Sequence, residues 1–119
     1  MVVDVENPAK SYQDRDFDTV LLEAIDDTFA ELLGEGVKKA LYDYLERNIS
    51  LKRTDIPGRL NDFRAALEKV AGTASIVMEK SIAKKVYSRL GLNYTDKPGY
   101  TLSDFVAEAR RNISQAAGP

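Results

Sequence analysis

The sequence contains neither cysteine nor histidine. Without cysteine there are no disulfide bonds, thiolate nucleophiles or thiolate metal sites. Without histidine the chain lacks the commonest metal ligand and the commonest general base near neutral pH, which leaves carboxylates, lysine and tyrosine for acid-base chemistry. We therefore expect a protein that is not an enzyme, with no catalytic residues, no cofactor and no metal site.

Long apolar runs are also missing. No stretch approaches the roughly 20 apolar residues of a membrane-spanning helix, and the opening MVVDVENPAK lacks the basic and then apolar order of a signal peptide. We expect a cytoplasmic protein that does not bind membranes. With 119 residues, of which 44% are hydrophobic and 30% charged, the chain is expected to form one soluble globular domain.

The two parts of the chain carry opposite net charges. Residues 1–33 contain nine acids and two bases, a net charge of −7, whereas residues 34–119 contain fifteen bases and ten acids, a net charge of +5. One interpretation is an acidic first helix that covers a basic surface of the domain, or mimics a polyanion there. The alternative, which we favour, is that two oppositely charged solvated faces lie side by side and keep the protein soluble.

Apolar residues recur at three- and four-residue steps in five segments, and alternating strand patterns are absent. These segments predict an all-α fold, a single compact domain of about five amphipathic helices within residues 16–115, preceded by a flexible acidic arm at 1–15. The predicted helices cover about 16–33, 36–48, 59–71, 73–90 and 101–113. Their predicted inward residues include Leu32, Val37, Val70 and Ile76. Between the second and third helices, Pro57 breaks the pattern, and Leu51 and Ile56 are expected to anchor this loop to the core.

The helix ends carry recognisable signals. Thr73 or Ser75 is expected to cap the fourth helix by accepting a hydrogen bond from a free amide of its first turn. Gly91 is expected to end that helix, because glycine tolerates the left-handed conformation found there. Thr101 and Asp104 match a capping box at the start of the fifth helix.

The segment SIAKKVYSRLGL (81–92) combines basic and apolar residues. On a helical wheel the aliphatic side chains gather on one side and the lysines on the other, which is typical of a core helix with a solvated rim. The alternative is a nucleic-acid-associated regulator that uses the basic face of this helix: Lys80, Lys84, Lys85 and Arg89. We favour the core helix, because lysine and serine hold phosphates but specify little sequence and because the net charge is −2.

Glu79 falls inside the apolar arc of the same helix, where an ionised carboxylate needs a partner. We favour a structural role, in which Glu79 meets a lysine or arginine of a neighbouring helix or reaches the surface near a helix N-terminus. The exposed basic residues of the 36–48 and 101–113 helices are the candidate partners. The alternative is a small-molecule binding site centred on Glu79, in which the carboxylate accepts a proton or contacts a ligand. Tyr42 is a further candidate, because a partly exposed tyrosine can anchor a partner protein.

Five segments together resemble the Nitrosopumilus output domain, an archaeal family of small helical domains, over residues 17–113. They are GEGVKKALYDYLE (34–46), LKRTDIP (51–57), FRAALEKVAG (63–72), MEKSIAKKVYSRLGL (78–92) and YTLSDFVAEAR (100–110). The resemblance implies an output or interaction module of archaeal signalling proteins, without an assigned reaction. We therefore expect a helical protein-interaction module, an output or adaptor domain in cytoplasmic signalling or regulation. The identity of its protein partner and its oligomeric state stay open.

Overall fold

The computed structural model describes the backbone of residues 8–117 and the side chains of residues 17–114. This part of the chain forms five α-helices and one 3-10 helix and contains no strand, which confirms the all-α prediction. The elements are α2 (Pro8–Leu33), α3 (Glu35–Ile49), η1 (Arg53–Gly58), α4 (Leu60–Ala71), α5 (Ala74–Arg89) and α6 (Leu102–Ala117).

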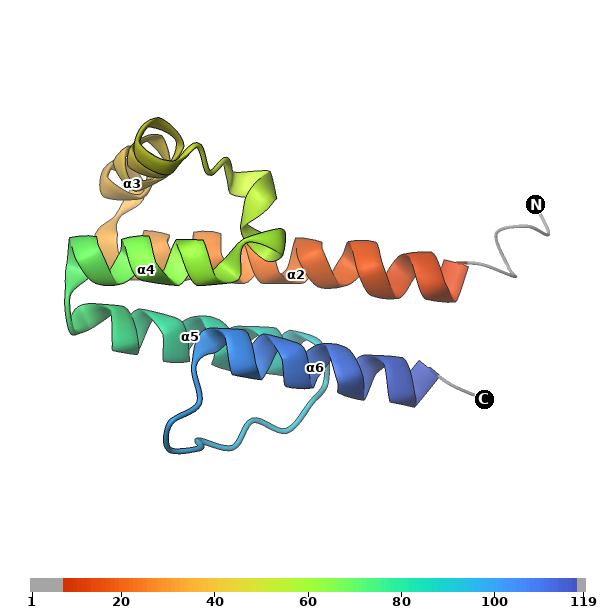
Figure 1. Cartoon of the computed structure of the whole chain (residues 1–119). Helices are drawn as coiled ribbons and strands as arrows, with labels where there is room; N and C mark the ends of the chain where they lie inside the picture. Colours follow the sequence, from red (N-terminus) through yellow and green to blue (C-terminus); the bar gives the residue numbers. More distant parts are fainter. Residues whose placement is uncertain (1–7, 118–119) are drawn as a thin grey trace.

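The long helix α2 organises the molecule (Figure 1). The helices α3, α5 and α6 pack on α2, while α4 packs on α5 and α6. The start of α2 and the end of α6 lie at one end of the molecule, and the turn between α4 and α5 lies at the opposite end, close to the start of α3. In Figure 1, α3 stands apart from the layer formed by α5 and α6.

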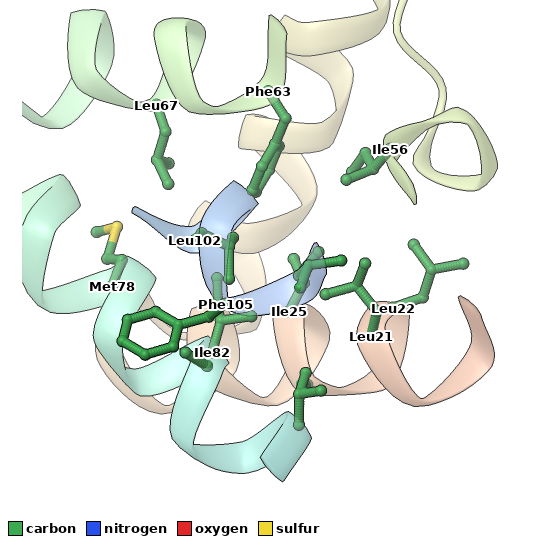
Figure 2. Packing of buried hydrophobic residues seen from close by; sticks show 14 of the residues in the cluster. Leu21, Leu22, Ile25, Ile56, Phe63, Leu67, Met78, Ile82, Leu102 and Phe105 are labelled. Atoms are coloured by element: carbon green, nitrogen blue, oxygen red, sulfur yellow. The ribbon is translucent and has the colours of Figure 1, made fainter. Parts of the chain in front are cut away.

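All six elements contribute to one hydrophobic core. Figure 2 shows Phe63 and Leu67 of α4 pointing toward the same interior as Ile25 of α2 and Ile82 of α5. The most deeply buried aliphatic and aromatic side chains are Phe17, Leu21, Ile25, Phe29, Leu45, Leu51, Ile56, Phe63, Leu67, Ile82, Val86, Tyr87 and Leu102. Burial of apolar area at about 25 cal/mol per Å² is what stabilises such a fold.

Two element boundaries differ from the prediction. The first helix begins at Pro8 rather than at Asp16, so residues 8–15 are helical and are not a separate arm. Proline suits this first position, because its fixed φ fits a helix and its missing N–H would have no partner there. Residues 1–7 of the predicted arm lie outside the described residues. The predicted loop contains η1, a 3-10 helix that includes Pro57.

The cap of α6 follows the prediction, but the cap of α5 does not. The Thr101 backbone N–H donates to Asp104 Oδ2 (2.9 Å) and the Asp104 N–H donates to Thr101 Oγ1 (3.2 Å), which is a reciprocal capping box. At the start of α5, Thr73 makes no side-chain cap hydrogen bond. Ser75 is buried, and its hydroxyl donates to the Gly72 carbonyl (2.7 Å) instead of accepting from an amide.

Gly91 ends α5 as predicted. Its φ is +73°, and its N–H donates to the Ser88 carbonyl (3.2 Å). The next N–H, of Leu92, donates to the Tyr87 carbonyl (2.8 Å). These two bonds form a Schellman motif, which satisfies two carbonyl groups that the end of the helix would otherwise leave free.

Leu51 and Ile56 are both buried, so the predicted anchoring of the 50–58 segment is confirmed. Other predicted core residues are exposed. Four side chains assigned to inward faces are about half exposed: Leu32, Val37, Val70 and Ile76. With Val77, they lie in the part of the chain that forms the end of α2, the start of α3 and the α4–α5 turn. Helical periodicity placed them correctly on an apolar stripe, but the neighbouring helices do not cover that stripe here.

Candidate functional site

The predicted basic face of α5 is engaged by other parts of the chain. Its members are Lys80, Lys84, Lys85 and Arg89. Lys80 Nζ lies 3.4 Å from Asp96 Oδ2 in the segment before α6. Lys84 Nζ lies 5.9 Å from the centre of the Tyr94 ring, close enough for a cation-π interaction. Both side chains are therefore held against the 90–101 segment.

The other two cations of this face reach α2. Lys85 Nζ lies 2.9 Å from Glu31 Oε1, and Arg89 Nη2 donates to Asp27 Oδ2 at 2.5 Å. Lys85 comes before Arg89 along α5, whereas its partner Glu31 comes after Asp27 along α2. The two helices therefore run antiparallel. The acidic face of α2 thus neutralises this half of the basic face.

Opposite charges meet at two more places along α2. Arg110 of α6 donates to Asp18 Oδ1 at 2.6 Å and lies 4.2 Å from the centre of the Phe17 ring. The guanidinium of Arg53 in η1 donates to both carboxylate oxygens of Asp26, at 3.0 and 2.6 Å. The acidic first helix therefore contacts basic side chains of the remainder of the chain. Since α2 also carries fully buried core residues, it is an integral part of the fold.

Tyr42 belongs to the same network. Its hydroxyl donates to Asp26 Oδ1 at 2.5 Å, and its ring centre lies 5.8 Å from that of Phe29. Burial raises the pKa of Asp26, but the hydrogen bonds from Arg53 and Tyr42 outweigh it, and the net pKa is lowered. Burial and the bond to Asp26 raise the pKa of Tyr42. These contacts tie η1 and α3 to α2 and occupy the Tyr42 hydroxyl within the domain.

Glu79 is nearly buried, with 13% of its side chain exposed. Its Oε1 accepts from Arg64 Nε at 2.9 Å and from the backbone N–H of Leu102 at 3.0 Å. The first amide of α6 therefore binds this carboxylate, and negative charge is favourable at a helix N-terminus. Arg64 is a basic residue of a neighbouring helix, as predicted, but it belongs to α4 and not to the second or fifth predicted helix.

A depression of about 520 Å³ lies beside Glu79, lined in part by Ile76, Tyr100 and Phe105. The charged side chains that line it are already paired: Arg64 with Glu79, Lys80 with Asp96 and Lys97 with Glu108. The charge pairs leave little free charge for recognising an ionic ligand.

Glu108 also accepts two bonds near this depression. Its donors are Lys97 Nζ and the hydroxyl of the buried Tyr87. The hydrogen bonds from Lys97 and Tyr87 lower the pKa of Glu108. Burial raises the pKa of Tyr87, and the hydrogen bond to Glu108 raises it further. The Phe105 carbonyl oxygen lies 3.1 Å from the same tyrosine oxygen. This cluster fixes the 90–101 segment to α5 and α6.

The most distinctive surface feature is an apolar groove of about 450 Å³ that the sequence did not predict. Its lining comes from α3 and α4, from the last residue of α2 and from the start of α5. The lining residues are Leu33, Val37, Ala40, Leu41, Tyr44, Leu67, Val70, Ala71, Ala74 and Met78. Val37 and Val70 are 53% and 51% exposed although both are aliphatic. Among ten lining side chains, the Tyr44 hydroxyl is the one polar group.

A second depression of about 380 Å³ lies next to the groove, lined by the end of α3 and by α4, and Tyr44 lines both. The second depression is more polar. Its other lining residues are Asn48, Ile49, Arg59, Asp62, Ala65, Ala66 and Lys69. We call the two together the α3–α4 trough.

Among the described residues, no group of three or more acidic side chains is arranged to hold a metal ion. No helix in the same part of the chain combines the length and apolar character needed to cross a membrane. Comparison of the chain with known protein families, curated proteins and solved structures finds no match. The resemblance to the Nitrosopumilus output domain therefore stays a prediction.

Proposed function

We propose that this domain is a protein-interaction module that binds an amphipathic helix of a partner protein in the apolar groove between α3 and α4. The observation that carries the proposal is the exposure of Val37 of α3 and Val70 of α4 in a groove whose lining is apolar except for the Tyr44 hydroxyl. Exposed aliphatic side chains gathered in a groove are a feature of sites that bind an amphipathic helix.

The helical walls favour a helical partner. Within residues 8–117 there is no strand, so an extended peptide would find no sheet edge to pair with. The backbone groups of α3 and α4 are used inside each helix, which leaves side-chain packing as the source of affinity. A helix presents aliphatic side chains at i, i+3/i+4 and i+7, and such a row fits a long groove.

The contacts of the basic face support this proposal over a nucleic-acid regulator. Lys80, Lys85 and Arg89 each have an acidic partner, and the partners of the last two lie on α2. Phosphate binding at this face would have to break these pairs. An output or adaptor role in signalling, as the resemblance implies, fits a module whose surface carries an apolar groove.

The test uses a displayed library of helical peptides of about four turns. Peptides that bind the wild-type domain are selected, and their affinities are then measured by fluorescence anisotropy for two variants. Val70→Glu places a charge in the groove and should weaken binding at least tenfold. Val77→Glu is the matched control, because Val77 is 60% exposed but does not line the groove; its affinity should stay within twofold of wild type. A library without enriched binders, or equal losses in both variants, would refute the proposal.

A further inference from the structure

The polar end of the α3–α4 trough adds information about the partner, on the condition that the proposed function is correct. Tyr44 lines both depressions, so they are neighbours along α3, and a helix that lies in the apolar groove parallel to α3 would reach the second depression as well. Along α3, the trough runs from Val37 to Asn48, which at 1.5 Å per residue is roughly 16 Å. This length corresponds to about three turns of a bound helix.

Two of the three charged side chains in the polar half are satisfied within the domain. Arg59 Nε donates to Asp62 Oδ2 at 3.0 Å, which pairs their charges. The two terminal nitrogens of Arg59 donate to the carbonyls of Ser50 and Ile49, at 3.0 and 3.1 Å, and so hold the end of α3. Arg59 and Asp62 are thus part of the scaffold of the trough.

Lys69 is the remaining charged residue. It is exposed on α4, and it has no acidic partner within the described part of the chain. The residues three and four positions away on its helix are Ala66 and Ala65, so no helical neighbour before it supplies a carboxylate. The polar half of the trough therefore has a net charge of +1, whereas the other half is apolar.

We propose that the partner helix carries a carboxylate beside its aliphatic stripe, and that this carboxylate meets Lys69. The aliphatic residues fill the apolar half between Val37 and Val70, and the acidic residue fixes the direction and register of the helix. An exposed lysine contributes more to specificity and association rate than to affinity. The preference for an acidic residue is thus expected to be modest and sensitive to salt.

The same peptide library tests this inference, with selection repeated on Lys69→Glu. Peptides selected by the wild-type domain should combine an aliphatic stripe with an acidic residue on one side of it. Replacing that residue by lysine should weaken binding to the wild-type domain about fivefold at low ionic strength, and this difference should shrink at 0.5 M NaCl. Lys69→Glu should reverse the preference. Lys39→Glu, a charge reversal at an exposed α3 residue outside the trough, should leave it unchanged.

The outcomes separate the two proposals. If selected peptides lose affinity with Val70→Glu but show the same charge preference with Lys69→Glu, the role of Lys69 is wrong and the interaction groove stands. If no peptide is enriched, both proposals fail. Sedimentation of the wild-type domain tests whether a second copy of the chain occupies the groove. A dimer that Val70→Glu converts to a monomer would show that it does, and would overturn the inference.

Discussion

The buried hydroxyl of Thr28 in α2 is expected to lower the stability of the fold. The residue is fully buried, and its Oγ1 has no hydrogen-bond partner among the described residues. A buried polar group without a partner costs about 1–3 kcal/mol. Valine has nearly the same shape and a similar helix propensity, so Thr28→Val should raise the free energy of unfolding by about 1 kcal/mol, measured by urea denaturation.

Ser75→Ala is the control for Thr28→Val. Ser75 is also buried, but its hydroxyl donates to the Gly72 carbonyl. Removal of a satisfied hydroxyl leaves that carbonyl without one partner, so this variant should lose about 1 kcal/mol. If both variants shifted stability in the same direction, hydrogen-bond satisfaction would not be the deciding factor at these two positions.

The ionisation of Glu108 makes the free energy of unfolding depend on pH. Its pKa in the folded protein is lowered from 4.5, first by the hydrogen bond from Lys97 and then by the bond from Tyr87. A carboxylate whose folded pKa is lowered stabilises the fold above the unfolded pKa, and this contribution is lost as the pH falls from about 4.5 through the lower folded value. Glu108→Gln should therefore be less stable than wild type at pH 7, with a difference that shrinks toward pH 3.

Urea denaturation at pH 7 and pH 3 checks this prediction. Glu23→Gln, at an exposed position of α2, controls for the loss of one negative charge and should follow the pH dependence of wild type. A stability difference between wild type and Glu108→Gln that is equal at both pH values would rule out the ionised contact as its source.

Single residues also show how far a sequence can identify a site. The place of Glu79 on an apolar helical stripe was enough to predict that an ionised carboxylate there needs a partner. Its partner, Arg64, could not be chosen from the sequence, because the choice depends on how α4 crosses α5 and on where the first amide of α6 lies. Periodicity gives the face of a helix but not the neighbour of that face.

At the scale of elements, two glycines should respond in opposite ways to alanine. Gly91 has φ +73° at the end of α5, where a side chain costs roughly 1–2 kcal/mol. Gly36 lies in the first turn of α3, and a Cβ there would meet no atom within 4 Å. Gly36→Ala should therefore stabilise the protein by about 0.5 kcal/mol, while Gly91→Ala should destabilise it. Thermal melting followed by circular dichroism measures both signs, and a stabilising Gly91→Ala would argue against the Schellman motif.

The sequence predicted four of the five α-helices closely, because each has an apolar stripe and a signal at one or both ends. It missed the first residues of α2, where residues 8–15 are polar and lack an apolar period. It also missed η1, since a 3-10 helix of six residues is too short to show periodicity. The apolar groove was hidden for another reason: Val37 and Val70 lie on apolar stripes, and only the separation of α3 from α4 leaves them exposed.

At the scale of the whole molecule, two forces hold α2 in place, and their magnitudes differ. Its acidic side chains pair with α5 and α6 through Asp18, Asp27 and Glu31, which are 45%, 50% and 61% exposed. Exposed ion pairs contribute about 0–1 kcal/mol each. Fully buried side chains of α2, such as Ile25, contribute to the core. Loss of a large buried aliphatic residue costs about 2–5 kcal/mol, so the core term dominates.

Two variants of α2 separate these forces. The triple variant Asp18→Asn/Asp27→Asn/Glu31→Gln removes three ion pairs and should lose at most about 3 kcal/mol while it still unfolds in one cooperative transition. Ile25→Asp places a charge among apolar side chains of several helices and should abolish that transition, because an unpaired buried charge costs more than a domain of this size can lose. Circular dichroism melts at 0.15 M NaCl compare the two. A triple variant that unfolds while Ile25→Asp keeps a cooperative melt would mean that charge attraction, and not apolar burial, attaches α2 to the rest of the domain.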